Sequence, residues 1–231
     1  MKKLASAIST VLLLTVFFAC QKTQDVASTL NTDEEILSCA GGGSTPPPTL
    51  ECGQFRTQSQ GGWGTSPYGN NSGSYLRSHF SAAFPAGMTI GCDGHGYSVF
   101  YSSAKAIAEF LPASGTASVL TVNAIDPRSR SIRNVLIGHI TALALNVGFD
   151  SFDWDFSPAD EQLGNLQILS GPFAGKSVSE FLSIANGVLG GCNTDYSVDA
   201  VNQTANAINA NFLDGRTNGG FLGCPVTRLE R

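Results

Sequence analysis

The chain has 231 residues, of which 13% are charged, and its formal net charge at pH 7 is −5. The basic side chains form no cluster, and an acidic surface repels polyanions, so charge argues against nucleic acid or anionic lipid as a partner. The length is sufficient for one sizeable domain with a tether.

The N-terminus has the pattern of an export signal. Two lysines precede an apolar run at residues 12–18, and the dipeptide Ala19-Cys20 follows it. A small residue and then cysteine at the end of such a run is typical of bacterial lipoproteins, in which the cysteine is lipidated. We therefore predict a lipoprotein signal peptide at residues 1–19, lipidation at Cys20, and an exported protein held by its lipid in the outer membrane or at the cell surface. An ordinary cleaved signal and an uncleaved anchor are the alternatives.

Residues 20–50 are predicted to be a flexible, lipid-anchored tether. The segment is polar, shows no sustained apolar periodicity and ends in the run AGGGSTPPPT. Glycine and serine make a linker flexible, and consecutive prolines add a short, stiff, extended piece. Because the composition changes at Glu51, we predict a single globular domain over residues 51–231.

The first part of this domain is predicted to contain short helices and strands. Apolar periodicity, capping residues and helix-breaking prolines place them. In chain order they are a helix at 75–84, strands at 88–91 and 97–101, a helix at 103–111 capped by Ser103, and a strand at 119–124.

Residues 131–147 are predicted to form the central buried helix. After Arg133 no charged residue occurs until Asp150, and apolar side chains occupy most faces of the helix. Such a helix is either a core helix or a membrane span. A span needs about 20 apolar residues, and this run is shorter and contains two asparagines and a histidine, so we place it in the core. Gly138 is small enough to admit a close neighbour.

Later elements complete a mainly helical pattern. They are a strand at 166–169, a helix from Ser177 to Gly190, and a last helix that begins at Asp195 or Ser197 and ends by Gly215. The predicted fold class is α+β, predominantly α. In this fold the 131–147 helix is surrounded by shorter helices and a few short strands, and disulfides tie the loops.

Four cysteines in the predicted domain are disulfide candidates: Cys52, Cys92, Cys192 and Cys224. An exported protein reaches an oxidising compartment, where disulfides are expected. Cys39 lies in the tether and is left over. Connectivity does not follow from sequence alone; among the possible pairings we predict Cys52 with Cys92 and Cys192 with Cys224.

The densest run of carboxylates follows the central helix. Its members are Asp150, Asp153, Asp155, Asp160 and Glu161. Closely spaced oxygen ligands suit Ca²⁺, although the spacing does not match an EF-hand loop. The alternative is a solvated acidic connector in which Phe152, Trp154 and Phe156 pack on the core. We expect no obligatory cofactor, and calcium is the one metal that the pattern suggests.

Aromatic side chains in and after the loop QGGWGTSPYGNN are candidates for ligand binding. Trp63, Tyr68 and Tyr75 lie among or close to glycines and asparagines, and loop aromatics of this kind can stack on sugar rings. A tryptophan in such a loop more often anchors the loop in the core, and both interpretations stay open. Glycans or surface and matrix proteins are the partners that we consider.

Several motifs in a fixed order resemble an uncharacterised secreted bacterial domain. They are FRTQ…GGWG (55–64), FPAGMTIGC (84–92), FLPASGT (110–116), NVLIGHITALALNVGFD (134–150), GPFAGKSVSEFL (171–182), VLGGC (188–192) and NGGFLGCP (218–225). The similarity covers nearly all of residues 51–225. It implies a place on cell-surface and matrix-type proteins but supplies no catalytic residues. His139 stands where the family more often has glutamine, which argues against an essential catalytic role for this histidine.

No catalytic signature accompanies these motifs. The chain contains no GxSxG or HExxH motif, and the glycines of GCDGHG do not precede a predicted helix as those of a dinucleotide loop would. We therefore assign no catalytic residues and expect a lipid-anchored cell-surface structural or adhesive module. A carbohydrate- or calcium-binding surface module is the first alternative. An extracytoplasmic hydrolase is the second, and it requires a pocket that gathers at least two of Asp93, His95, Asp153 and Asp155.

Overall fold

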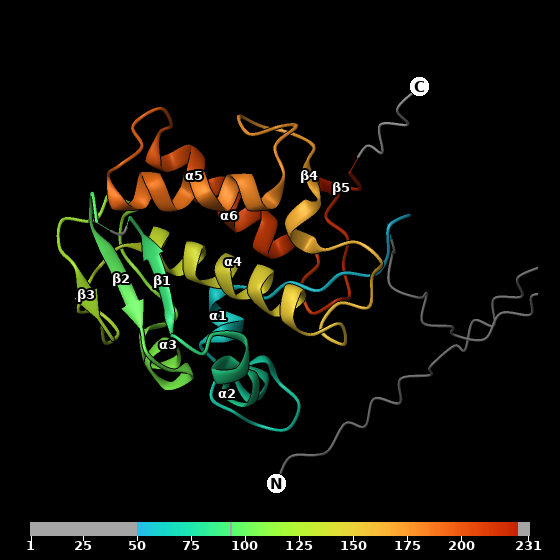
Figure 1. Ribbon diagram of the computed structural model, residues 1–231, viewed down its shortest axis with the longest axis horizontal. Helices are drawn as coiled ribbons and strands as arrows, with labels where there is room; N and C mark the ends of the chain where they lie inside the picture. Colours follow the sequence, from blue (N-terminus) through green and yellow to red (C-terminus); the bar gives the residue numbers. More distant parts are fainter. Residues whose placement is uncertain (1–49, 93, 226–231) are drawn as a thin grey trace, which may run out of the picture. The chain divides into compact units, whose positions relative to one another are not determined.

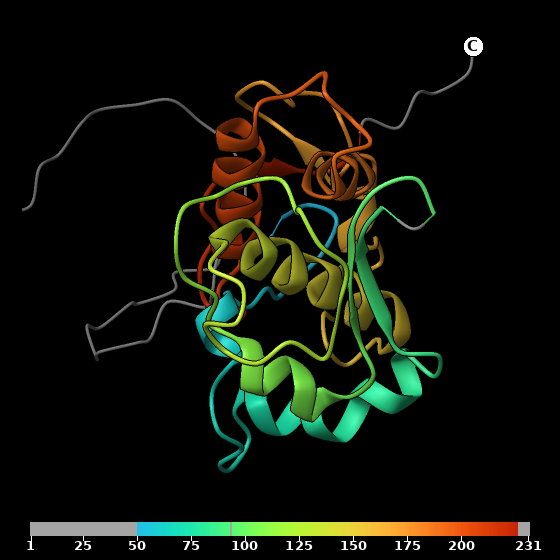
Figure 2. The same ribbon diagram turned by 90° about the vertical axis from the view of Figure 1, so that its left-hand side faces the viewer.

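One long helix, α4, runs through the middle of the fold in this computed structural model, which describes residues 50–92 and 94–225. The α-helices are α1 (Gln60–Trp63), α2 (Ser72–Ala83), α3 (Ala104–Phe110), α4 (Val135–Phe152), α5 (Val178–Gly190) and α6 (Val198–Asn211). Figures 1 and 2 show α5 and α6 on one side of α4, with α1, α2 and α3 on the other.

Two small sheets lie beside the helices. Their strands are β1 (Met88–Gly91), β2 (Ser98–Tyr101) and β3 (Ala124–Ile125) in one sheet, and β4 (Gln167–Ile168) and β5 (Leu222–Gly223) in the other. β1 pairs antiparallel with β2, β3 pairs parallel with β2, and β4 pairs antiparallel with β5. A short 3-10 helix, Leu163–Asn165, precedes β4. Helices make up most of the regular structure, so the predicted α+β, predominantly α class is confirmed.

The N-terminal predictions fall outside the described residues. These are the signal peptide at 1–19, the lipidation site Cys20 and all of the predicted 20–50 tether except Leu50. Cys39 lies in this part of the tether. They stay predictions.

The central helix begins and ends later than the predicted range of 131–147. Asn134 is its N-cap, because the Asn134 Oδ1 accepts a hydrogen bond from the Leu136 backbone N–H at 3.1 Å. The Asn134 amide also donates to the Ser118 carbonyl at 2.6 Å, which fixes the preceding loop to the helix start. At the other end the helical bonds continue until the Asp153 N–H bonds the Phe149 carbonyl at 2.8 Å.

The burial of α4 agrees with its apolar sequence. Among the described helices, α4 is the one long and apolar enough to cross a membrane by length and composition. Here α1, α2, α5, α6 and β1 pack against it instead, and side chains such as Leu143 are fully buried. At Gly138, the Gln60 side chain and Ala113 approach so closely that a Cβ would clash with them. The predicted close neighbour at Gly138 is therefore confirmed.

The predicted starts of α3, α5 and α6 are confirmed by their caps. Ser103, Ser177 and Ser197 each accept a hydrogen bond from a backbone N–H three residues further along the chain. In α5 the Glu180 side chain accepts in return from the Ser177 N–H, which completes a capping box. Gly191 then ends α5 with a φ of +81°, a conformation that favours glycine.

All four predicted cysteines form disulfides, but the predicted pairing is wrong. Cys52 bonds to Cys224, and Cys92 bonds to Cys192. The pairs span 172 and 100 residues of sequence respectively, so the packing of distant segments selected the partners. Both bonds are compatible with an extracytoplasmic location.

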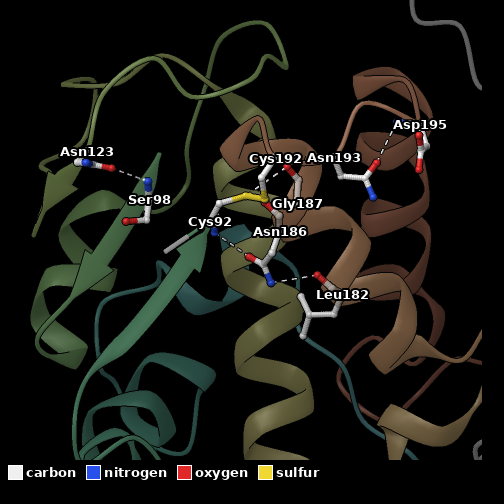
Figure 3. Close-up of a disulfide and its surroundings, with 10 residues drawn as sticks. Cys92, Ser98, Asn123, Leu182, Asn186, Gly187, Cys192, Asn193 and Asp195 are labelled. Carbon is white, nitrogen blue, oxygen red and sulfur yellow. Dashed lines mark hydrogen bonds between the residues drawn. A yellow bond between two sulfur atoms is a disulfide. The ribbon is translucent and has the colours of Figure 1, made fainter. Parts of the chain in front are cut away.

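The Cys92–Cys192 bond lies where the end of β1 meets the end of α5, as Figure 3 shows. The Gly91 N–H donates to the Asn186 Oδ1 at 2.8 Å, which holds the strand against the helix. Gly190 has no room for a Cβ because the Cys92 backbone and sulfur occupy that space. This close approach brings Cys92 to Cys192.

A buried asparagine in α4 joins three segments of the chain. The Asn146 Oδ1 accepts from the Gln58 backbone N–H at 2.9 Å and from the Trp63 indole N–H at 3.1 Å. The Asn146 Nδ2 donates to the Gln58 carbonyl and to the Asn209 Oδ1, both at 2.9 Å. A side-chain amide has two donors and an oxygen with two acceptor sites, so every site on Asn146 is used. These bonds fix the segment before α1, α1 itself and α6 to the central helix.

We expect Asn146→Ala to lower the free energy of unfolding by at least about 3 kcal/mol, measured by urea denaturation. The substitution leaves the backbone groups of Gln58 and the indole N–H of Trp63 without partners in a closed site, and each unsatisfied buried group costs about 1–3 kcal/mol. The matched control is Asn206, which is exposed on α6. Asn206→Ala should leave stability unchanged or slightly higher, because alanine is the better helix former. Equal effects of the two substitutions would contradict the role of the network.

Candidate functional site

A polar cleft opens where the segment around α1 meets the turn that follows α6. Its volume is about 520 Å³, which lies within the range of about 300–1,000 Å³ typical of small-molecule sites. The lining side chains come from three separate parts of the sequence and include Arg56, Asn70, Tyr75, Phe156, Asp214 and Arg216. Of the predicted binding residues, Trp63 and Tyr75 also line this cleft, and Tyr68 does not.

Aromatic rings close the inner side of the cleft. Trp63 is fully buried, and its ring stacks on Phe156 with centroids 6.1 Å apart and lies 5.3 Å from the ring of Phe149. Its indole N–H is already bonded to Asn146. Trp63 is therefore the anchor of its loop in the core, and its burial excludes it as an exposed surface for stacking on a sugar.

The other two predicted aromatic binding residues differ in their surroundings. Tyr68 is 85% exposed. Tyr75 is half-buried in α2: its hydroxyl donates to the Asp153 Oδ2 at 2.5 Å, and its ring stacks on His79 at 4.0 Å. Burial and the bond to Asp153 raise the pKa of Tyr75, so its phenol is protonated at neutral pH and is held in place at the cleft wall.

The exposed tryptophan of the described residues is Trp154, with 76% of its surface accessible. In the alternative to a calcium site, Phe152, Trp154 and Phe156 were all predicted to pack on the core. Phe156 does so, whereas Phe152 is also largely exposed. Helix α4 ends at Phe152, and only Phe156 reaches the rings around Trp63.

The carboxylates predicted to bind calcium do not converge on one site. Asp153 is bonded to Tyr75, Glu161 accepts from Asn165 at 2.6 Å, and Asp155 and Asp160 are exposed. Asp150 points inward to the backbone of the 3-10 helix. Within residues 50–92 and 94–225, no three His, Cys, Asp or Glu side chains lie close enough together to hold a metal ion. In this structure these side chains bond to protein groups or face solvent separately, and calcium binding stays a prediction.

Two guanidinium groups line the cleft without a carboxylate partner. Among the described residues the one ion pair is Lys105 with Glu109, so neither Arg56 nor Arg216 has a described carboxylate oxygen within 4.0 Å. The Arg56 guanidinium lies over the ring of Phe156, 5.6 Å from its centroid, which is a cation–π arrangement. The cleft therefore offers charged hydrogen-bond donors that form no ion pair with any residue in 50–92 or 94–225.

A carboxylate in the same cleft is held in place by a different partner. The Asp214 Oδ1 accepts from the Gln58 Nε2 at 2.9 Å, and the Asp214 N–H donates to the Thr57 carbonyl at 3.0 Å. Asp214 has a φ of +56°, a left-handed conformation that aspartate tolerates better than most residues. The turn after α6 is thus bound to the segment before α1, and this contact forms the end of the cleft.

Neither the cleft nor the hollow at His95 gathers two of the described residues that the hydrolase alternative requires. Asp93 lies outside the described residues, and His95 lines a separate hollow beside the Cys92–Cys192 bond. Neither Asp153 nor Asp155 lines the hollow that contains His95, and neither lines the cleft that contains the two guanidinium groups. His139 is half-buried in α4, and burial lowers its pKa, so its imidazole is neutral at pH 7.

The chain matches no protein-family model, no curated protein and no solved structure. The resemblance to a secreted bacterial domain stays a prediction.

We expect Asp150→Asn to stabilise the protein at pH 7. Burial raises the pKa of Asp150, so the folded state binds the proton more tightly than the unfolded chain does. Proton binding by Asp150 therefore stabilises the folded state. This stabilisation is complete below the pKa that Asp150 has in the unfolded chain, and it is lost as the pH rises through its higher pKa in the folded protein. Asparagine removes the charge and keeps an acceptor for the Leu163 N–H, which bonds the Asp150 Oδ2 at 2.6 Å in the wild type.

The measurement is urea denaturation of both proteins at pH 7 and at about pH 3, below the usual aspartate pKa. The advantage of Asp150→Asn should shrink at the lower pH. Asp160→Asn at an exposed position is the control and should show no such change. An Asp150→Asn effect independent of pH would rule out burial of the charge as its origin.

Proposed function

We propose that this chain is a lipid-anchored cell-surface module of the adhesive kind and that its cleft binds a glycan. The observation that carries the proposal is the combination of concave shape and free polar groups in one place. Arg56 and Arg216 have no described ion-pair partner, and Asn70 makes no side-chain hydrogen bond among the described residues. A ligand rich in hydroxyl groups would pair with such donors and acceptors.

The character of the lining favours a saccharide over an apolar ligand. Polar and charged side chains surround the opening, and the aromatic rings of Tyr75 and Phe156 form part of the wall. A purely apolar ligand would take the guanidinium groups out of water without giving them partners, and burying an unpaired charge is costly. A sugar ring can meet both kinds of group, because it carries hydroxyls at its edge and C–H groups on its faces.

Binding is favoured over catalysis by the state of the titratable groups. Tyr75 is protonated and bonded to Asp153, and Asp214 is bonded to Gln58. General acid–base chemistry needs a pair of groups that exchange protons near neutral pH, and the described cleft residues supply no such pair. A purely structural module would not need an open polar cleft.

The surface location is supported by three independent features. The N-terminal residues have the lipoprotein pattern ending at Cys20, the segment after it has the composition of a linker, and two disulfides join the folded part. Disulfides persist outside the reducing cytoplasm. The resemblance to a cell-surface domain agrees with this location.

We expect a saturable glycan ligand when the purified full chain is screened on a glycan array. Asn70→Trp should weaken that binding at least tenfold, because an indole at this cleft position fills the space that the ligand needs. Asn206→Trp places the same side chain on the exposed side of α6, away from the cleft lining, and should bind like the wild type. A blank array, or equal binding by Asn70→Trp and the wild type, would contradict the proposal.

We expect Cys20→Ala to release the protein from the membrane fraction of cells that express it. The lipid is attached through the cysteine sulfur, and alanine cannot accept it. The readout is immunoblotting of membrane and soluble fractions, and Cys39→Ala is the matched control that should remain with the membranes. Retention of Cys20→Ala in the membrane fraction would show that another segment anchors the chain.

A further inference from the structure

We infer that the cleft selects an acidic saccharide and that Arg56 and Arg216 bind its oxyanion. The inference rests on the proposed function, glycan binding, and it names the class of glycan. The two arginines line one cleft, neither forms an ion pair with a described residue, and the carboxylate of Asp214 lines the same cleft.

The two arginines are close together in space, although 160 positions separate them in the sequence. A Cβ built on Gly215 would lie 3.7 Å from the Arg56 Nε, so the Arg56 side chain passes alongside the residue that precedes Arg216. Both side chains line the same cleft. Like charges in one cleft repel each other, and an oxyanion between them would replace repulsion with charge-assisted hydrogen bonds.

The Arg56 guanidinium is held in position before any ligand arrives. Its cation–π contact with Phe156 fixes the head group, and the Arg56 backbone N–H donates to the Ser157 Oγ at 3.1 Å. A planar guanidinium that is already oriented loses less conformational entropy when it binds an oxyanion. Arg216 is exposed and can complete the contact from the opposite segment.

The remaining lining argues for an oxyanion that belongs to a sugar. Asp214 stands in the same cleft, and Gln58 engages its Oδ1, which leaves the Oδ2 to accept from a hydroxyl. This carboxylate repels any oxyanion, whether free or part of a sugar, but it can accept hydrogen bonds from the several hydroxyl groups that a saccharide carries. The chain as a whole has a net charge of −5, so it has no general attraction for anions, and recognition must come from this local pair of arginines.

The test is isothermal titration calorimetry of the full chain with three probes of equal length: tetragalacturonate, sulfated maltotetraose and neutral maltotetraose. We expect at least one of the two acidic probes to bind at least tenfold more tightly than the neutral one, and its affinity to fall as salt is added. The carboxylated and sulfated probes together show which oxyanion the cleft prefers. Inorganic phosphate is titrated as the free-anion comparison.

Arg216→Gln should lower the affinity for the acidic probe at least tenfold and leave the affinity for neutral maltotetraose unchanged. Its side chain is exposed, so the variant tests binding without disturbing the core. Arg56→Gln should have the same effect, and its thermal melting curve shows whether the loss of the Phe156 contact has affected folding. Arg128→Gln removes an exposed arginine outside the cleft lining and should change neither affinity.

The outcomes separate this inference from the proposed function. Equal affinity for acidic and neutral probes, with no effect of Arg216→Gln, would overturn the inference and leave glycan binding intact. Phosphate binding as tight as that of tetragalacturonate would overturn the assignment to a saccharide. If neither the array nor the three probes show binding, the proposed function fails and the inference fails with it.

Discussion

The fold depends on the side-chain amide of Asn146, because this one group joins α4 to the segment before α1, to the Trp63 indole and to α6. A buried amide is tolerated only when its hydrogen bonds are made. The four bonds of Asn146 therefore select one register of the Gln58 segment against the central helix. A shift of this segment by one residue would break the two backbone hydrogen bonds of Gln58 to Asn146. The polar groups of Asn146 would then lack partners at a site that is closed to water.

The cleft follows from that register. Once Gln58 is fixed, its side chain reaches Asp214 and binds the turn after α6. Arg56, two residues earlier, lines the same cleft and lies over Phe156. The bonds of Asn146 satisfy that buried amide, whereas the two guanidinium groups of the cleft have no ion-pair partner among the described residues. The contrast between the fully bonded amide of Asn146 and the free polar groups of the cleft is the physical basis for proposing that the cleft binds a polar ligand.

The two tryptophans show that tertiary packing, and not local composition, decides whether an aromatic side chain is exposed. Trp63 lies in a loop rich in glycine and asparagine, which is typical of exposed binding segments, yet Phe149, Phe156 and the Asn146 amide enclose it. Trp154 follows the central helix among aromatic residues, which favoured the core, yet it is exposed. Local composition is similar for both, and the available space around each ring is set by residues far away in the chain.

The sequence by itself determined the features that depend on neighbouring residues. These are the fold class, the capped starts of α3, α5 and α6, the β1 strand, the approximate place of α4 and the four cysteines that form disulfides. A cap or an apolar stripe acts within a few residues, so its consequence is visible in the sequence. The tertiary structure alone decided the pairing of the cysteines, the burial of Trp63, the dispersal of the acidic side chains and the approach of Arg56 to Gly215. Each of these depends on contacts between segments distant in sequence, and no local pattern records which distant segments meet.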